Sequence, residues 1–284
     1  MQQKDVKKMI KKYFSPTSLE ELENLKSNIN GVLFSGGTDL FVKMRYGIID
    51  PEIVIDTKKI NTKITCNNRK IFIPMNITYT ELLTYIEKEQ KNTFLKQVIK
   101  LIGSPMIRNR GTPIGNIANA SPAGDFLLVS YLLNGQVLIK PSNRIIPIEN
   151  FVLGPSKINL SQNEFIYGIE LDIKENYKFY FEKIGRRNAM VISISSIALL
   201  LKEKDGKIED ISVCYGSVAP TILRNKEFEK RLIGEKVSLE TFKYIASTFE
   251  KLSTPIDDIR ATKDERKKLV HNLTIKAFHN LKGW

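Results

Sequence analysis

The chain interrupts an apolar strand with two adjacent glycines and then resumes as a helix-like run. The stretch from Leu33 to Gly47 reads LFSGGTDLFVKMRYG, and the short apolar segment GVLF at residues 31–34 leads into the glycine pair. Consecutive glycines expose backbone N–H groups without a Cβ in the way, so such a turn can wrap around an anion. A plain strand–turn–helix junction, with Thr38 or Asp39 as the cap of the helix, explains the same pattern. Both interpretations stay open for this loop alone.

A second segment, residues 102–125, has the same chemical character. It reads IGSPMIRNRGTPIGNIANASPAGD, and we predict a long loop because it shows no helical or strand period. Unstructured segments of this length inside a compact domain are usually functional or disordered, and the interleaved Ile and Met residues argue against disorder. An ordered Ω-like loop, in which Asn and Ser side chains serve backbone turns, is the structural alternative.

The second segment also offers groups that suit a nucleotide. Thr112 provides a hydroxyl, Gly115 an open backbone and Asn116 an amide, and the carboxylate of Asp125 can accept hydrogen bonds from ribose hydroxyls. Neither GxGxxG nor GxxxxGK[ST] occurs, so a Rossmann or P-loop site is disfavoured. Two separate phosphate-competent loops suggest a diphosphate cofactor held between them.

Length and periodicity predict a soluble protein with more than one part. The chain has 284 residues, of which 42% are hydrophobic, and a chain of this size can bury a proper core. The first hundred residues alternate helix and strand, with Thr78 and Glu81 as a predicted capping box. Two β-rich runs surround the turn at residues 204–206 and predict an antiparallel hairpin, after which two helices follow. We expect a boundary near residues 173–177.

Charge and cysteine content exclude several classes. Lys and Arg number 44 against 31 acidic residues, but the lysines are scattered, so we interpret the net charge of +13 as compositional. A basic docking face for an acidic partner is the alternative, and an RNA-binding protein is disfavoured because the glycine loops lack interleaved aromatics. Cys66 and Cys214 lie far apart, without the spacing of an iron–sulfur or structural zinc site. With a charged start and no apolar stretch longer than residues 190–201, we expect a cytoplasmic protein.

Five motifs in order resemble one family. The stretches FSGGTDLFVKMRYG and PEIVIDTKKI look like the first FAD loop of the flavin subunit of molybdenum hydroxylases, the xanthine dehydrogenase and carbon monoxide dehydrogenase flavoproteins. The segment at residues 102–125 resembles the second FAD loop of these proteins. FEKIGRRNAMVISISSIAL, YGSVAPTILR and PIDDIRATKDERKKLVHNL are similar to their C-terminal domain, so the resemblance covers about residues 14–281.

The resemblance implies a fold and a division of the chain. The fold is α+β, with a two-part FAD-binding domain at residues 1–175, a small α/β subdomain at about 1–60 and a larger mixed α/β subdomain at 61–175. Residues 176–284 form a C-terminal domain with an antiparallel sheet followed by helices. FAD lies in the cleft between them, as ligands often do at domain interfaces.

It also implies fourteen cofactor-binding residues, with no catalytic or metal-ligating residue on this chain. The first loop contributes Leu33, Phe34, Ser35, Gly36, Gly37, Thr38 and Asp39. The second contributes Thr112, Gly115 and Asn116, with Asn119 close by and Asp125 on the ribityl or ribose hydroxyls. Leu160 covers the adenine or flavin side, and Lys183 lies near the isoalloxazine, where a cation favours the reduced flavin.

The sequence departs from the family pattern in the second loop. The usual GTIGGN is replaced by GTPIGN, so Ile114 stands where a glycine is expected and Pro113 removes a backbone donor. This change predicts a shifted loop or weaker FAD binding. Arg186 and Arg187 follow the glycine of FEKIGRR, and they face an acidic partner, the phosphates of a nicotinamide cofactor, or solvent.

The implied activity is electron transfer within a complex. Electrons from [2Fe-2S] clusters on a small subunit, supplied by a molybdopterin-binding large subunit, pass through FAD to NAD+ or another acceptor. A stand-alone FAD-dependent reductase of similar fold, such as the UDP-N-acetylenolpyruvylglucosamine reductase group, is the alternative. Such an enzyme would act on its own substrate without partners.

Overall fold

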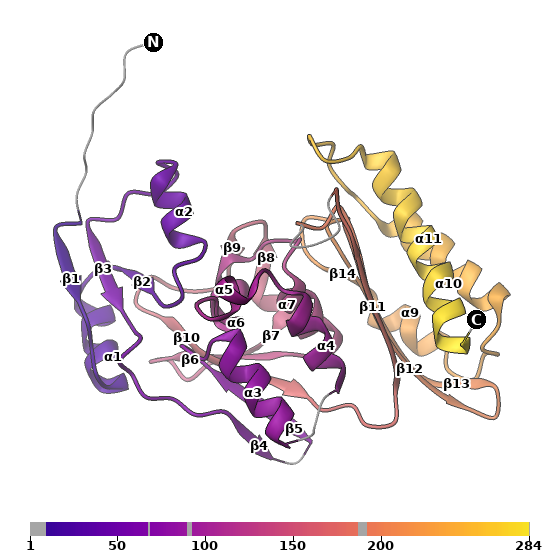
Figure 1. The fold of residues 1–284 in the computed structure, drawn as a ribbon, viewed down its shortest axis with the longest axis horizontal. Coiled ribbons are helices and arrows are strands. Elements are labelled where there is room, and N and C mark those ends of the chain that lie inside the picture. The colour runs from indigo at the N-terminus through magenta and orange to yellow at the C-terminus, as the bar shows by residue number, and fades with distance from the viewer. Residues whose placement is uncertain (1–9, 68, 90–92, 187–191, 284) are drawn as a thin grey trace, which may run out of the picture.

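The computed structural model describes residues 10–67, 69–89, 93–186 and 192–283, which form two parts (Figure 1). The strands of the first part are β1 Lys12–Phe14, β2 Val32–Phe34, β3 Ile53–Asp56, β4 Thr65–Asn67, β5 Lys70–Pro74, β6 Gln136–Lys140, β7 Ile145–Pro147, β8 Val152–Gly154, β9 Lys157–Ile158 and β10 Phe165–Asp172. Its helices are α1 Leu19–Asn28, α2 Leu40–Arg45, α3 Tyr79–Glu89, α4 Thr93–Leu101, α5 Pro105–Arg108, α6 Pro113–Asn119, α7 Asp125–Leu132 and α8 Ile148–Phe151.

The second part is a sheet followed by helices. Its elements are β11 Lys178–Ile184, β12 Ser195–Lys204, β13 Lys207–Gly216, β14 Leu223–Arg224, α9 Lys226–Arg231, α10 Leu239–Leu252 and α11 Lys263–Lys282. The predicted α+β class and the predicted antiparallel hairpin of β12 and β13 are both confirmed. The expected boundary falls in the connection between β10 and β11, and it stays a proposal.

A small parallel sheet places the first glycine loop. β1 and β2 both pair with β3 in the same direction, in the order β1-β3-β2. Parallel strands bring their carboxyl ends to one edge of a sheet, which is where ligands bind in open α/β sheets. The chain leaves β2 at that edge through residues 35–39 and enters α2, as the pattern predicted. The loop therefore faces the rest of the first part.

A larger antiparallel sheet carries the second loop. Its strand order is β4-β5-β10-β6-β7, and it shares one hydrophobic core with α3, α4, α6 and α7. The predicted capping box holds at α3, where the Thr78 hydroxyl accepts from the Glu81 N–H and the Glu81 carboxylate accepts from the Thr78 N–H. The same core therefore fixes the walls of the cavity described below.

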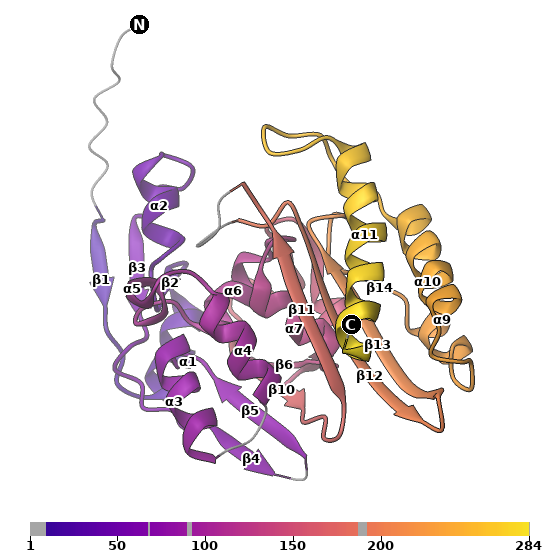
Figure 2. The ribbon, with the colours of Figure 1, turned by 45° about the vertical axis from the view of Figure 1, so that its right-hand side comes forward.

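The C-terminal sheet lies between two layers of helices. In Figures 1 and 2, α10 and α11 cover one face of β11-β12-β13-β14, and α7 packs against β12 and β13 from the other side. Along β12, Ala198 and Leu200 join the core of the first part, while Ile197, Leu199 and Leu201 join that of α10 and α11. Because both faces are covered, this strand reads as a continuous apolar run.

The structure corrects one prediction about residues 102–125. The segment contains two short helices, α5 and α6, instead of a long loop. Ser104 and Thr112 cap them through hydrogen bonds from the N–H groups of Ile107 and Gly115. A proline occupies the first turn of each, where its missing N–H breaks no helical bond. Both helices are shorter than the window in which a helical period becomes visible.

No helix within residues 10–67, 69–89, 93–186 and 192–283 combines the length and the apolar character needed to cross a bilayer.

Candidate cofactor-binding site

A cavity of about 570 Å³ lies where the two predicted loops meet. This volume is within the range of about 300–1,000 Å³ that is usual for small-molecule sites. Most of the predicted site residues line it: Leu33, Ser35, Gly36, Gly37, Thr38, Asp39, Thr112, Gly115, Asn116, Asn119 and Leu160. The two loops, although separated by about seventy residues in the sequence, therefore form one concave surface.

Gly36 lies where the two loops touch. A Cβ at this position would be 3.1 Å from the Gly111 Cα and 2.9 Å from the Arg110 carbonyl carbon, and closer still to the Arg110 oxygen. The second loop is anchored in turn, because the Tyr79 N–H donates to the Gly111 oxygen at 3.0 Å. Only glycine fits at position 36 without moving this backbone, so the close approach of the loops depends on it.

Two buried hydroxyl groups of the cavity wall have no partner within the described residues. They are the Oγ of Ser35 and the phenolic oxygen of Tyr79, both on residues that line the cavity. Burial raises the pKa of Tyr79 well above its usual value, so the group is an O–H donor at neutral pH. A buried hydroxyl without a partner costs free energy, and a ligand with acceptor oxygens would satisfy both groups. The wall therefore suits a cofactor rich in hydroxyls and phosphates.

Polar side chains join the loops on another side of the cavity. The Asn119 Nδ2 donates to the Asp39 carboxylate at 3.1 Å, and the Lys43 Nζ donates to the Asn119 Oδ1 at 2.6 Å. The pairing connects α6 to the residues around α2 over almost eighty positions of the sequence. Asp39 caps no helix with its side chain, although it occupies the cap position of α2. The Asp39 carboxylate thus stabilises the contact between the two loops and does not cap α2.

Hydrogen bonds made by its own side chains fix the conformation of the second loop. Thr112 accepts a hydrogen bond from the Gly115 N–H at 3.0 Å, and the Asn116 Oδ1 accepts one from the Leu127 N–H at 3.0 Å in the first turn of α7. These bonds leave the Asn116 amide nitrogen free to donate. The loop presents a rigid backbone because its own side chains satisfy its turns.

Two family models match the chain in succession. The model described as the FAD-binding domain in molybdopterin dehydrogenase matches residues 7–171, and the C-terminal domain of the CO dehydrogenase flavoprotein matches residues 179–281. This chain belongs to the FAD-binding subunits of the molybdenum hydroxylase family. The resemblance stated from the five motifs is confirmed, and the chain is an oxidoreductase subunit.

Relatives of similar length share this organisation. The glyceraldehyde dehydrogenase medium chain of Sulfolobus acidocaldarius is 30% identical over 273 residues, which are 94% of this chain and 96% of the relative. The xanthine dehydrogenase FAD-binding subunit of Escherichia coli O157:H7 is 24% identical over 92% of both chains. Carbon monoxide dehydrogenase from Hydrogenophaga pseudoflava superposes with a TM-score of 0.91 at 23% identity, covering 98% of this chain and 99% of that one, which shows the shared fold.

The departures from the family loop are compatible with this cavity. Pro113 is the first residue of α6 and is buried, so its ring sits where no helical N–H bond would form. Ile114 lines the cavity and adds an apolar wall in place of an open backbone. The remaining glycine of this loop is Gly115, where an added Cβ would lie 2.8 Å from the Thr112 hydroxyl that caps α6. A flavin subunit with this loop offers fewer backbone donors but keeps the cavity.

Three predicted residues are outside the cavity wall. The Phe34 ring is buried edge-on against Phe41, with the Lys58 ammonium 3.4 Å above its centre. Asp125 and Lys183 form a buried ion pair of 2.6 Å, each with a side chain that is 10% exposed, and Lys183 also donates to the Leu101 oxygen at 2.8 Å. This pair joins α7 to β11, which positions the C-terminal domain against the FAD-binding domain.

We expect the substitution Lys183→Met to destabilise the chain by about 2–3 kcal/mol, because it leaves the buried Asp125 carboxylate without its partner. Burial already raises the pKa of Asp125, against the opposing effect of Lys183. A carboxyl whose pKa is higher in the folded state opposes folding when it ionises. The loss should therefore grow as the pH rises from about 4 to about 7.

Thermal unfolding of wild type and variant across this pH range measures the effect. Lys178→Met, on the same strand, is the matched control, because Lys178 makes an exposed pair with Glu203 and should change little. A Lys183→Met difference that stays constant over the pH range would contradict the role assigned to Asp125.

Several lining residues gave no sequence signal. Lys26 and Tyr79 belong to ordinary helix patterns and Asn76 to a turn after β5, and only the folded chain brings them to the cavity. Of the two arginines of FEKIGRR, Arg187 lies outside the described residues. The Arg186 Nε donates to the Arg260 oxygen at 3.1 Å.

Proposed function

We propose that this chain binds FAD in the cavity and passes electrons from the [2Fe-2S] clusters of a small partner subunit to NAD+. A large subunit with a molybdopterin cofactor would be the source of the electrons. The observation that carries the cofactor assignment is the joined pair of loops, closed at Gly36 and lined by the free hydroxyls of Ser35 and Tyr79. Membership in the family supports the same assignment.

Different residues of the cavity would bind different parts of the cofactor. The backbones of Gly36, Gly37 and Gly115 would approach the diphosphate, with Ser35 and Thr38 as hydroxyl donors. Asn116 and Asn119 would hydrogen-bond to polar groups of the cofactor, while Leu33 and Leu160 would exclude water from it. Asp125 and Lys183 would act indirectly, by fixing the C-terminal domain. Bound FAD supplies the exchange between single electrons and a hydride, and these residues bind and orient it.

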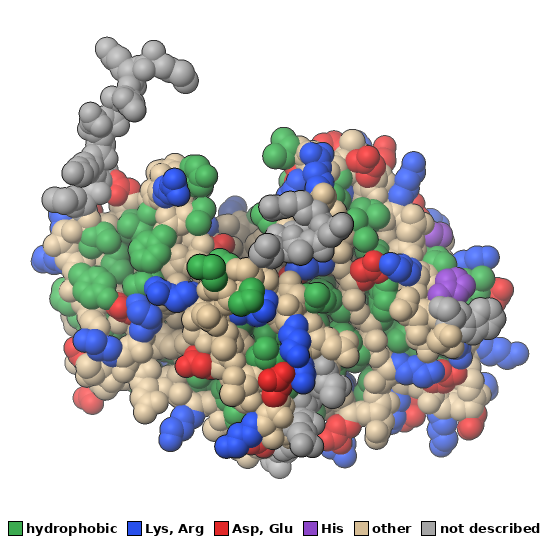
Figure 3. Space-filling model, in the orientation of Figure 1, with side chains coloured by type: hydrophobic (Ala, Val, Ile, Leu, Met, Phe, Trp, Pro, Cys, Tyr) green, Lys and Arg blue, Asp and Glu red, His purple; other side chains and the backbone are tan. Residues whose placement is uncertain are grey.

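The partner subunits are proposed from the relatives and the surface. Relatives carry names such as medium chain and FAD-binding subunit, which describe one chain of a larger complex. Hydrophobic side chains gather over the first sheet and α2 in Figure 3, where α2 and the following turn expose Phe41, Val42, Tyr46 and Ile48. Exposed apolar areas of this kind mark interaction surfaces. On the same face basic and acidic side chains are interspersed, unlike the continuous basic patch of a nucleic-acid-binding protein.

An absorbance spectrum of the purified chain, with and without added FAD, tests the cofactor, and chromatography of the released compound identifies it. Anaerobic addition of NADH then tests the acceptor, because transfer to NAD+ is reversible. Bleaching of the flavin band by NADH supports the proposal. A chain that binds FAD but does not react with NADH would overturn the assignment of NAD+ while leaving the FAD site intact.

Replacing Tyr79 with phenylalanine should weaken FAD binding by roughly tenfold, the effect of one hydrogen bond in a dry site. The ring packs edge-on against Phe126 and is retained in the variant, so the fold is expected to stay intact. Fluorescence titration with FAD measures the change. Tyr244→Phe, at a residue that is 60% exposed on α10, is the control. Unchanged affinity in Tyr79→Phe would show that the hydroxyl does not face the cofactor.

A further inference from the structure

A buried lysine without a counter-charge lines the cavity. Lys26 lies in the last turn of α1 and is 8% exposed. Within the described residues its ammonium forms no hydrogen bond or ion pair. Burial lowers its pKa, and no neighbouring charge offsets that effect. Such a group costs free energy in the ligand-free chain, because an unpaired charge in this position loses part of its hydration.

The other charged side chains of the cavity wall all have hydrogen-bond partners. Asp39 and Lys43 both bond to Asn119, at 3.1 Å and 2.6 Å. Glu164 accepts two hydrogen bonds from Arg144, at 3.0 Å and 2.8 Å. Among the charged residues that line the cavity in the described part of the chain, Lys26 is therefore the one without a hydrogen bond.

We propose that Lys26 is an anion-binding residue that pairs with the diphosphate of the cofactor. The inference rests on the proposed function, because FAD carries its negative charge on that group. The glycine loops offer backbone and hydroxyl donors, which are neutral, and the Lys43 ammonium is held by Asn119, so Lys26 would add a positive charge with all its donors available. Charge-assisted hydrogen bonds to phosphate are stronger than neutral ones. A lysine that is unfavourable in the empty cavity becomes favourable when the diphosphate arrives.

The variant Lys26→Met tests this role with two measurements, the affinity for FAD and the melting temperature, which should change in opposite directions. Affinity for FAD and for ADP should fall by roughly 10- to 100-fold, while affinity for adenosine, which has no phosphate, should not change. The melting temperature of the ligand-free chain should rise, since a buried unpaired charge is replaced by an apolar group of similar length. Lys26→Arg should retain most of the affinity. Lys59→Met, at an exposed lysine of the same subdomain, should behave as wild type.

The outcomes separate this inference from the function on which it rests. Wild-type protein that fails to bind FAD would overturn the proposed function itself. Wild-type protein that binds FAD, with Lys26→Met binding equally well, would overturn the inference alone. Equal weakening of FAD and adenosine would also overturn it, because the contact would then lie on the adenosine portion. A lower melting temperature of ligand-free Lys26→Met would point to a structural role and contradict the proposal as well.

Discussion

Gly36→Ala should remove most of the FAD binding of this chain. The new Cβ would lie 2.9 Å from the Arg110 carbonyl carbon and 3.1 Å from the Gly111 Cα, and these are backbone atoms that cannot rotate away. The Gly111 N–H is held by the Ile107 oxygen at 2.6 Å, so a shift of the second loop would strain α5. Overpacking of this kind costs about 1–3 kcal/mol, and the loops would separate where they enclose the cofactor.

Two measurements distinguish loss of the cofactor from loss of the fold. The ratio of FAD to protein in the absorbance spectrum should fall, whereas the melting temperature of the ligand-free chain should change by only a few degrees. Gly206→Asn is the control, because this glycine has open space around it and asparagine tolerates its left-handed backbone. It should keep the wild-type content of FAD. If Gly36→Ala also does so, the contact between the loops does not control the site.

Local patterns predicted the parts of the site that depend on neighbours in the sequence. The strand that ends at Phe34, the glycines after it and the helix from Leu40 are all read from a dozen consecutive residues. The capping box of Thr78 and Glu81 is equally local, and it appears in the structure. Such features follow from backbone chemistry that any fold must respect, so a single sequence suffices to find them.

Contacts over long distances in the sequence escaped prediction. Nothing near Tyr79 indicates that its hydroxyl would be buried beside a loop thirty residues away, and Lys26 reads as an ordinary charged residue of an amphipathic helix. The resemblance implied Asp125 and Lys183 as cofactor contacts; in the structure they pair with each other across 58 positions, and neither is among the residues that line the cavity. Only the packing of β11 against the first part decides that geometry. The sequence therefore predicted the two loops, but not Tyr79 and Lys26, which line the cavity beside them.

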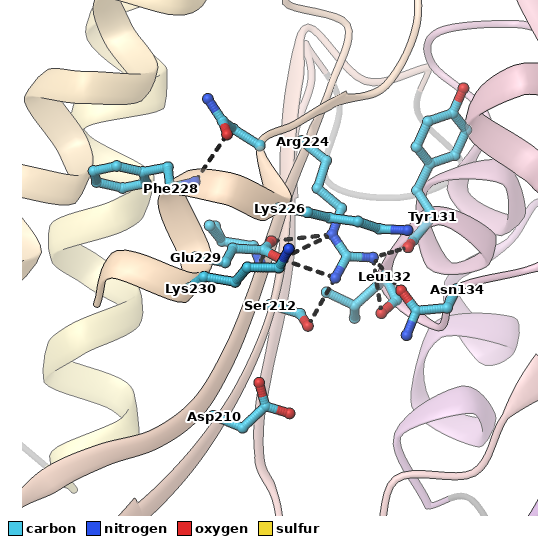
Figure 4. Close-up of polar contacts among 12 residues, drawn as sticks. Tyr131, Leu132, Asn134, Asp210, Ser212, Arg224, Lys226, Phe228, Glu229 and Lys230 are labelled. Carbon is cyan, nitrogen blue, oxygen red and sulfur yellow. Dashed lines mark hydrogen bonds and ion pairs between the residues drawn. The ribbon is translucent and has the colours of Figure 1, made fainter. Parts of the chain in front are cut away.

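Arg224→Met should destabilise the chain by about 3–5 kcal/mol, and so lower its melting temperature by roughly 5–15 °C. Figure 4 shows the Arg224 guanidinium between the two domains, with Glu229 on one side and the end of α7 on the other. It donates to the Glu229 carboxylate at 2.9 Å and to the Asn134 side-chain oxygen at 3.0 Å. It also donates to the backbone carbonyl of Tyr131. The side chains of Arg224 and Glu229 are 8% and 6% exposed.

The pH dependence of the variant follows from Glu229. Burial raises the pKa of this carboxyl, and the hydrogen bond and charge of Arg224 oppose the rise. Without the arginine, the pKa rises further in the folded state only. Ionisation then opposes folding, so Arg224→Met should lose more stability as the pH increases from about 4 towards about 7. Arg231→Met, at an exposed arginine on the same helix as Glu229, should show neither the loss nor the pH dependence.

The double variant Arg224→Met, Glu229→Gln separates the ion pair from the domain contact. Replacing the carboxylate removes the buried charge, so the pH dependence should disappear and part of the stability should return. The carbonyl of Tyr131 and the amide of Asn134 still lack their donor, however, so stability should stay below that of the wild type. Full recovery of the stability would mean that the Arg224 guanidinium contributes only through its interaction with Glu229. A residual loss would show that Arg224 also fastens the C-terminal domain to α7, whose first residue, Asp125, pairs with Lys183 of β11.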